Sequence, residues 1–209
     1  MFEMFMPTPL SLQQYLLRAA AILLVVGIHG LLLAVAARLL GDRGPSHAGR
    51  FTLNPLVHLD LIGAIAAILY RPGWMRPMRI DHEELRLGRF GLILCALIAC
   101  GGTVFLGIAA QFLKPLIATL VAGNVGLTIQ SIITTFGRIS LWFGLVNLLP
   151  LTPLTGGHIL AAVSPAAGKL LEKHLLWPTI AVALLIASGL AERIVAPAYA
   201  LLAPLGVGL

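Results

Sequence analysis

Long apolar runs without charge constrain the fold of this chain more than any other feature. Five runs lack Asp, Glu, Lys and Arg: Ala19–Ala37, Phe90–Leu113, Pro115–Gly137, Ile139–Gly168 and Leu175–Ala191. About 20 helical residues cross the roughly 30 Å of hydrocarbon in a bilayer. Only 11% of the residues are charged, against about 25% in soluble domains. We therefore predict an all-α polytopic membrane protein with about five to six transmembrane helices, the sixth in residues 194–209.

The net charge of +6 comes from basic residues at the ends of these runs. They form two groups, Arg38, Arg43 and Arg50 in one loop and Arg71, Arg76, Arg79, Arg86 and Arg89 in another. Basic loops that border apolar segments are typical of the cytoplasmic side of a membrane. This pattern excludes a nucleic-acid partner, and it predicts a cytoplasmic loop over residues 71–89 that contacts anionic lipids.

Residues 51–70 do not fit a plain membrane span. The stretch Phe51–Pro55 alternates like a strand and ends at a proline, and Leu56–Tyr70 is too short to cross a bilayer comfortably. Irregular backbone at membrane depth persists only where protein or a wet cavity surrounds it. We predict a short re-entrant or strand-like segment near residues 51–60, within a single integral membrane domain over residues 1–209.

Three stretches carry a resemblance to a known family. They are His29–Asp42 (HGLLLAVAARLLGD), Gly49–Asp60 (GRFTLNPLVHLD) and Asn147–His158 (NLLPLTPLTGGH). In this order they resemble the site-2 protease family of intramembrane zinc metalloproteases, in its short bacterial form. The resemblance covers residues 16–165 and leaves 175–209 as extra C-terminal apolar segments. It also implies a multi-pass location in a bacterial-type inner (cytoplasmic) membrane.

The resemblance implies a zinc site that this sequence has largely lost. In a His-Glu-x-x-His helix, two histidines four residues apart bind zinc and the glutamate acts as general base. Carried onto this chain, the ligand positions are His29, Leu33 and Thr155, and the base position is Gly30. Loss of a general base alone lowers a rate by about 10² to 10⁴. We therefore expect a degenerate family member that is not an enzyme and has no cofactor.

A non-catalytic homologue would serve as an accessory subunit that binds another integral membrane protein, with lipids around it and no soluble substrate. The residues predicted for partner binding are Asn54, Pro55, His58, Asp60, Pro153, Gly156 and Gly157. Two alternatives stay open. One is a metalloprotease whose metal site is rebuilt from His29, His58 and His158, and the other is a small transporter.

Overall fold

The computed structural model describes residues 11–206 and builds them from helices. The helices are α1 (Leu12–Leu40), α2 (Gly44–His47), α3 (Pro55–His58), α4 (Leu61–Tyr70), α5 (Arg89–Gln111), α6 (Lys114–Leu120), α7 (Gly123–Val146), α8 (Gly157–Val163), α9 (Pro165–Lys173), α10 (Leu176–Ala187) and α11 (Leu190–Gly206). Within the described residues there is no β-strand, and a single antiparallel bridge joins Leu59 to Met75. The predicted all-α class is confirmed.

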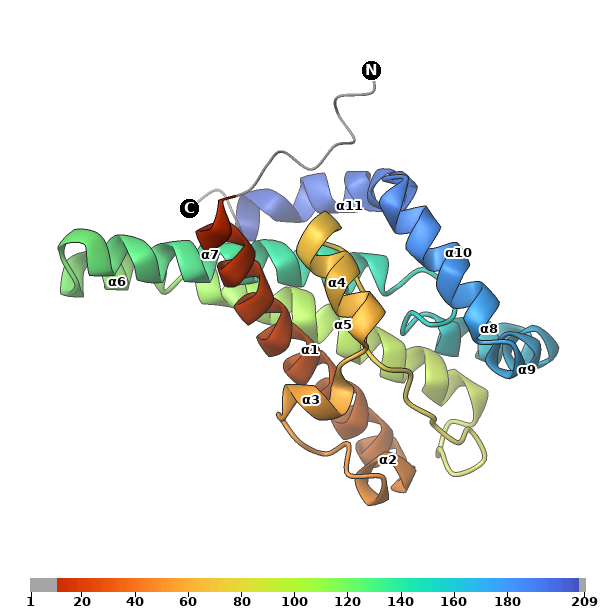
Figure 1. The fold of residues 1–209 in the computed structure, drawn as a ribbon. Coiled ribbons are helices and arrows are strands. Elements are labelled where there is room, and N and C mark those ends of the chain that lie inside the picture. The colour runs from red at the N-terminus through yellow and green to blue at the C-terminus, as the bar shows by residue number, and fades with distance from the viewer. Residues whose placement is uncertain (1–10, 207–209) are drawn as a thin grey trace.

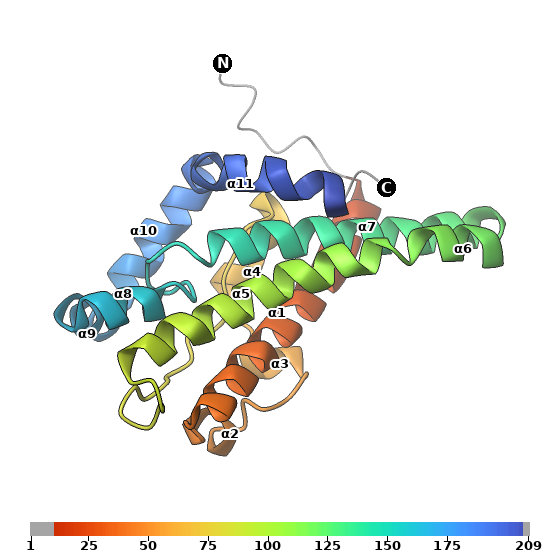
Figure 2. The same cartoon turned by 180° about the vertical axis from the view of Figure 1, so that it is seen from behind.

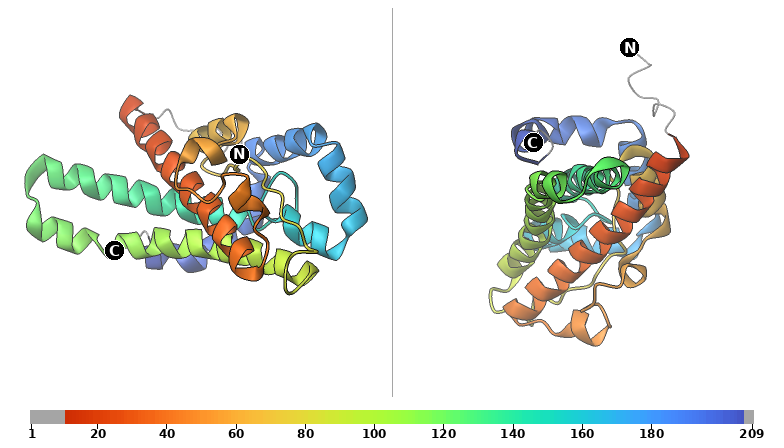
Figure 3. Two further views of the ribbon diagram at one scale, coloured as in Figure 1. Left: turned by 90° about the horizontal axis from the view of Figure 1, so that it is seen from below. Right: turned by 90° about the vertical axis from the view of Figure 1, so that its left-hand side faces the viewer.

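Helices α1, α5 and α7 form the centre of the fold. Figure 2 shows α5 and α7 running side by side while α1 crosses them, and all three pairs are in contact. Helix α11 lies against α7 (Figure 1). The turn between α6 and α7 lies at the far end of a hairpin that extends away from the other helices (Figure 3).

Three helical segments are long and apolar enough to cross a membrane: Leu12–Leu40, Arg89–Leu120 and Gly123–Val146. Helices α9 and α10, bent by 94° at the break between them, would add a fourth if they act as one span. These segments indicate a membrane protein, but they do not confirm the predicted five to six spans. The location in an inner membrane stays a prediction.

Two of the predicted runs do not form separate spans. Residues 115–137 are divided at Gly123, whose positive φ of 72° suits glycine. Arg138, which was expected to end a run, lies inside α7. Residues 139–168 are divided again after Val146, where an irregular loop leads to α8. The breaks therefore follow backbone geometry and not the position of the charges.

The segment near residues 51–60 is irregular, with one helical turn, and is not a strand. Asn54 caps the turn of α3, because its side chain accepts a hydrogen bond from the Leu56 N–H at 3.1 Å. Asp60 caps α4 in the same way through the Gly63 N–H at 2.8 Å. Beyond α4 the chain runs extended from Gly73 to Ile80, and the Arg76 N–H donates to the His58 carbonyl at 2.7 Å.

Helix α4 is short and ends against α1. Its 10 residues are followed by Arg71, the one described non-glycine residue with positive φ. The guanidinium of Arg18 on α1 donates to the Ile68 carbonyl at 3.1 Å. This contact satisfies one of the carbonyl groups that the end of a helix leaves without a partner.

Asp42 fixes the chain beyond the other end of α1. The carboxylate is 1% exposed and accepts hydrogen bonds from the Gly44 N–H at 2.6 Å and from the Asp81 N–H at 2.9 Å. It therefore ties the loop after α1 to the loop before α5.

Candidate functional site

His29 lies in the middle of α1, fully buried, where α1 meets α5, α7 and the loop before α8. Its Nδ1 is 2.9 Å from Oγ1 of Thr103 on α5. Its Nε2 is 2.7 Å from Oγ1 of Thr155 in the loop. The edge of the ring packs against Phe143 of α7 with 5.2 Å between the ring centroids. Four elements therefore fix the orientation of this imidazole.

The hydrogen bonds around His29 fit a tautomer with the hydrogen on Nδ1. The Thr103 hydroxyl donates its only hydrogen to the Ala99 carbonyl at 2.7 Å, because a carbonyl can only accept. If the same hydroxyl accepts toward His29, the imidazole hydrogen is on Nδ1. The lone pair on Nε2 then accepts the hydrogen of the Thr155 hydroxyl.

Asn147, at the end of α7, holds the loop that carries Thr155. Its Nδ2 donates to the Phe143 carbonyl at 2.9 Å and to the Gly73 carbonyl at 2.8 Å. Its Oδ1 accepts the Thr155 N–H at 3.3 Å, and its carbonyl accepts the Gly156 N–H at 2.6 Å. One buried amide thus links α7, the extended segment and the Thr155 loop.

His58 fills the space beside Gly30. A Cβ placed on Gly30 would overlap the imidazole ring of His58. The ring is buried, and its Nε2 donates to the Thr52 carbonyl at 3.0 Å while its Nδ1 has no hydrogen-bond partner among the described residues. Burial lowers the pKa of His58 below its usual value. The family's general-base position therefore holds glycine because another side chain occupies the room.

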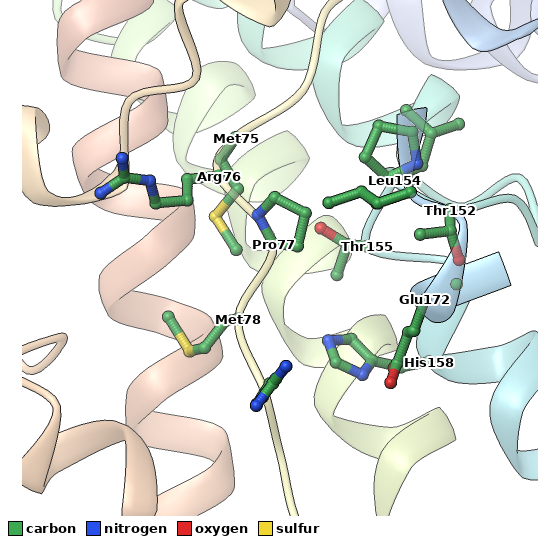
Figure 4. Close-up of a pocket in the computed structure, with 13 residues that line it drawn as sticks. Met75, Arg76, Pro77, Met78, Thr152, Leu154, Thr155, His158 and Glu172 are labelled. Carbon is green, nitrogen blue, oxygen red and sulfur yellow. The ribbon is translucent and has the colours of Figure 1, made fainter. Parts of the chain in front are cut away.

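A cleft of about 240 Å³ opens beside Thr155. One wall is the extended segment Met75–Arg79, and the other comes from Thr152–Thr155, Gly157 and His158, with Glu172 and Leu175 at the margin. Figure 4 shows Thr155 between these walls, with the ring of His158 directed into the same space. Thr155 is only 4% exposed, and its hydroxyl is hydrogen-bonded to the buried His29.

The side chains at this site do not fit the catalytic zinc of the site-2 protease family, which the sequence resembles. Such a site uses three protein ligands, but the ligand positions Leu33 and Thr155 offer an apolar chain and a neutral hydroxyl. Among residues 11–206 no three His, Cys, Asp or Glu side chains are grouped so that they could hold a metal ion. His29, His58 and His158 therefore do not form the rebuilt site that was considered as an alternative.

The residues predicted for partner binding are divided between two places. Pro153 and Gly157 line the cleft, with Gly156 buried behind them. The side chains of Asn54 and Asp60 cap helices, and neither they nor Pro55 line the cleft. Binding of a partner by these residues stays a prediction.

The sequence reasoning missed two parts of the site. Thr103 received no role from the sequence, and residues 75–79 were considered only as part of a basic loop. A signal for Thr103 was present, since it is the single hydroxyl side chain between Phe90 and Ala110. A lone hydroxyl in a long apolar run often has a buried partner.

Comparison with curated proteins gives one informative relative. The chain is 31% identical over 170 residues to "Putative zinc metalloprotease YwhC" of Bacillus subtilis (strain 168), and the match covers 78% of this chain and 75% of the relative. No family model matches the chain, and neither does any solved structure.

This relative corrects one prediction. The expectation that the chain is not an enzyme is wrong, since the relative is described as a zinc metalloprotease. The comparison supports the relationship to metalloproteases, and it favours a metalloprotease over the accessory subunit, although the three histidines do not form the rebuilt metal site.

Proposed function

The chain belongs to the family of this Bacillus subtilis zinc metalloprotease, and from that premise we propose that it is a membrane-embedded peptidase acting on a segment of another membrane protein. The observation that carries the proposal is the cleft lined by the Thr152–Thr155 loop, which lies directly above the buried contact between Thr155 and His29.

The wall formed by Met75–Arg79 favours an extended substrate. Within the described part of the chain, the backbone N–H groups of Met78 and Arg79 have no hydrogen-bond partner. An extended segment with an unpaired N–H group can bind a peptide by strand addition, in which the main chain supplies the hydrogen bonds and side-chain pockets supply selectivity. A peptide bond on this edge would lie across the cleft from Thr155.

The lining of the cleft indicates a substrate from the membrane border. Met75, Met78 and Leu154 give it an apolar part, while Arg76, Arg79 and Glu172 are charged. A membrane-protein segment that passes from the hydrocarbon to the aqueous side has an apolar part and a polar part, as the lining of the cleft does. Since the three candidate spans make this chain itself a membrane protein, its substrate would meet it within the bilayer plane.

The test is a comparison of membrane proteins cleaved with and without this chain. Membranes from cells that express it and from cells that lack it would be compared by mass spectrometry of new N-termini. The strongest candidate would then be reconstituted with the purified protein in liposomes. We expect cleavage in a segment that borders the apolar region.

Two arginine variants of one loop provide a matched pair. Arg79→Trp places a bulky ring in the cleft, whereas Arg86→Trp makes the same change at an exposed position outside the residues that line it. We expect cleavage to fall at least about tenfold in the first variant and to be unchanged in the second, because only the first excludes the substrate. Absence of any cleaved membrane protein, or equal activity of both variants, would contradict the proposal.

A further inference from the structure

A second cavity lies next to the cleft, between the loop before α5 and helix α9. One wall is the loop Arg79–His82, and the other is α9, through residues that include Gly168 and Lys169. His158 and Glu172, both labelled in Figure 4, line this cavity as well as the cleft. Its volume is about 270 Å³, whereas pockets for whole small-molecule ligands usually measure about 300–1,000 Å³. The cavity therefore suits a small polar group.

Charges of both signs line this cavity without forming ion pairs. The Arg79 guanidinium and the Lys169 ammonium are positive, and the Glu172 carboxylate is negative. All three residues are exposed, and within residues 11–206 none of these charged groups has a hydrogen bond or an ion pair. Asp81 differs, because its carboxylate accepts the Glu83 N–H at 2.9 Å. Two cations and one carboxylate are therefore accessible to a ligand.

Apolar side chains are exposed beside these charged groups. Leu170 belongs to α9, and Leu176 and Trp177 begin α10. Helix α10 is bent away from α9 by 94°, so the two helices cannot cross a bilayer as one straight rod. With α10 in the hydrocarbon, α9 lies along the membrane surface, as amphipathic helices do. Tryptophan is enriched at that border, so the cavity lies at the depth of the lipid headgroups.

We propose that this cavity binds the headgroup of an ethanolamine phospholipid. The phosphate would lie between Arg79 and Lys169, the ammonium would lie against Glu172, and the acyl chains would follow the apolar residues at the start of α10. This inference does not rest on the peptidase function proposed above, because lipid binding is measured without any cleavage.

The two cations are suited to a phosphate. Hydrogen bonds between ionised groups are shorter and stronger than those between neutral groups. A guanidinium can bind two phosphate oxygens at once, whereas an ammonium acts as a point charge. Arg79 and Lys169 belong to opposite walls of the cavity, so one phosphate between them would connect the loop before α5 to α9.

The Glu172 carboxylate distinguishes among phospholipids. The primary ammonium of ethanolamine offers three N–H donors, like that of lysine, and a carboxylate accepts them. A choline headgroup carries the same charge but has no N–H donor, and a glycerol headgroup has no positive charge. The exposed apolar surface beside the cavity further favours a lipid over a soluble phosphate compound, because acyl chains that cover it remove apolar area from water.

The first experiment counts the lipids bound to the purified chain by native mass spectrometry. Ethanolamine, choline and glycerol phospholipids with identical acyl chains would be added in turn to the protein in detergent. We expect one ethanolamine lipid per chain, bound at least about tenfold more tightly than either of the others because only it satisfies the buried side of both charges. Soluble glycerophosphoethanolamine at equal concentration should not displace this lipid. Equal binding of the three lipids would overturn the headgroup assignment, and displacement by the soluble compound would overturn the lipid.

Two lysines of α9 provide a matched pair of variants. Both are exposed, but Lys169 lines the cavity and Lys173 does not. Lys169→Gln should weaken binding of the ethanolamine lipid at least about tenfold, and Lys173→Gln should leave it unchanged. Glu172→Gln should reduce the preference for the ethanolamine lipid over the glycerol lipid, because it removes the charge that attracts the ammonium. Equal lipid affinity of the two lysine variants would overturn the site.

A second measurement locates the acyl chains. Trp177 is 69% exposed, whereas the other two tryptophans, Trp74 and Trp142, are buried. An ethanolamine lipid with brominated acyl chains quenches the fluorescence of a tryptophan that it contacts. At one lipid per chain we expect quenching in the parental protein, none in Trp177→Phe, and less in Lys169→Gln. Quenching that persists in Trp177→Phe would place the lipid elsewhere and count against this site.

Discussion

Replacement of Gly30 by alanine tests the packing that underlies the site. The new methyl group would overlap the imidazole of His58, which is fully buried and hydrogen-bonded to the Thr52 carbonyl. Overpacking of a filled core costs about 1–3 kcal/mol. Loss of the hydrogen bond as the ring shifts adds about 0.5–1.5 kcal/mol, whereas alanine in a helix recovers about 1 kcal/mol relative to glycine.

The net destabilisation by Gly30→Ala is therefore about 2 kcal/mol. For a chain of this length it corresponds to a decrease in Tm of about 4–8 °C, measured by thermal unfolding of the purified protein in detergent. The matched control is Gly101→Ala on α5, where a Cβ would meet nothing within 4 Å. We expect this control to gain about 0.5–1 kcal/mol from helix propensity alone.

A double variant separates the steric effect from a general effect on α1. In the His58→Ala background the imidazole ring is absent, so Gly30→Ala should lower the free energy of unfolding little further. The effects of the two substitutions on that free energy should therefore be coupled by at least about 1 kcal/mol. The reasoning is refuted if Gly30→Ala melts at or above the parental Tm. It is also refuted if the two destabilisations simply add.

Three further predictions concern the surroundings of the site. Asn147→Ala should destabilise the protein by about 2–3 kcal/mol in thermal unfolding, because the buried Thr155 N–H loses its acceptor and the Gly73 carbonyl its donor. Asp42→Ala should speed limited proteolysis of the loops on either side of its carboxylate, whereas cleavage near α10 should not change. Stability should decrease as the pH falls from about 6.5 toward 4. Burial lowers the pKa of His158 to about 4, whereas an unfolded histidine takes up its proton near 6.5, so protons favour the unfolded chain. His158→Gln should flatten this dependence in unfolding measured at pH 7 and pH 5, and an unchanged slope would count against the lowered pKa of His158.

The class of the fold was predictable, but the helix boundaries were not. Apolar composition and run length predicted the helices that became α1 and α5, because burying backbone polar groups in hydrocarbon requires helices. Charges were poor markers of helix ends. Arg138 lies inside α7, and Glu192 lies inside α11. Proline was no better a marker, since Pro197 also lies inside α11. One charged side chain does not end a helix when neighbouring chains or the surface accommodate it.

The site was predictable only in part. The resemblance identified His29 and Thr155 as counterparts of metal ligands, yet it could not show that they would form a hydrogen bond with each other. That contact joins residues 126 positions apart and depends on how α1 meets the loop after α7. The role of Gly30 was also hidden, because the sequence shows a missing carboxylate but not the His58 ring that takes its place.

The contact between Arg18 and the end of α4 bears on how the protein is assembled during synthesis. Ten helical residues extend about 15 Å, about half of the hydrocarbon thickness, so α4 cannot insert as an independent span. Its terminal carbonyls would face lipid without partners, at a cost of several kcal/mol each. Arg18 supplies a donor from α1, which emerges from the ribosome first. The support that Arg18 gives to α4 thus also holds in place the wall of the cleft, which directly follows α4 in the chain.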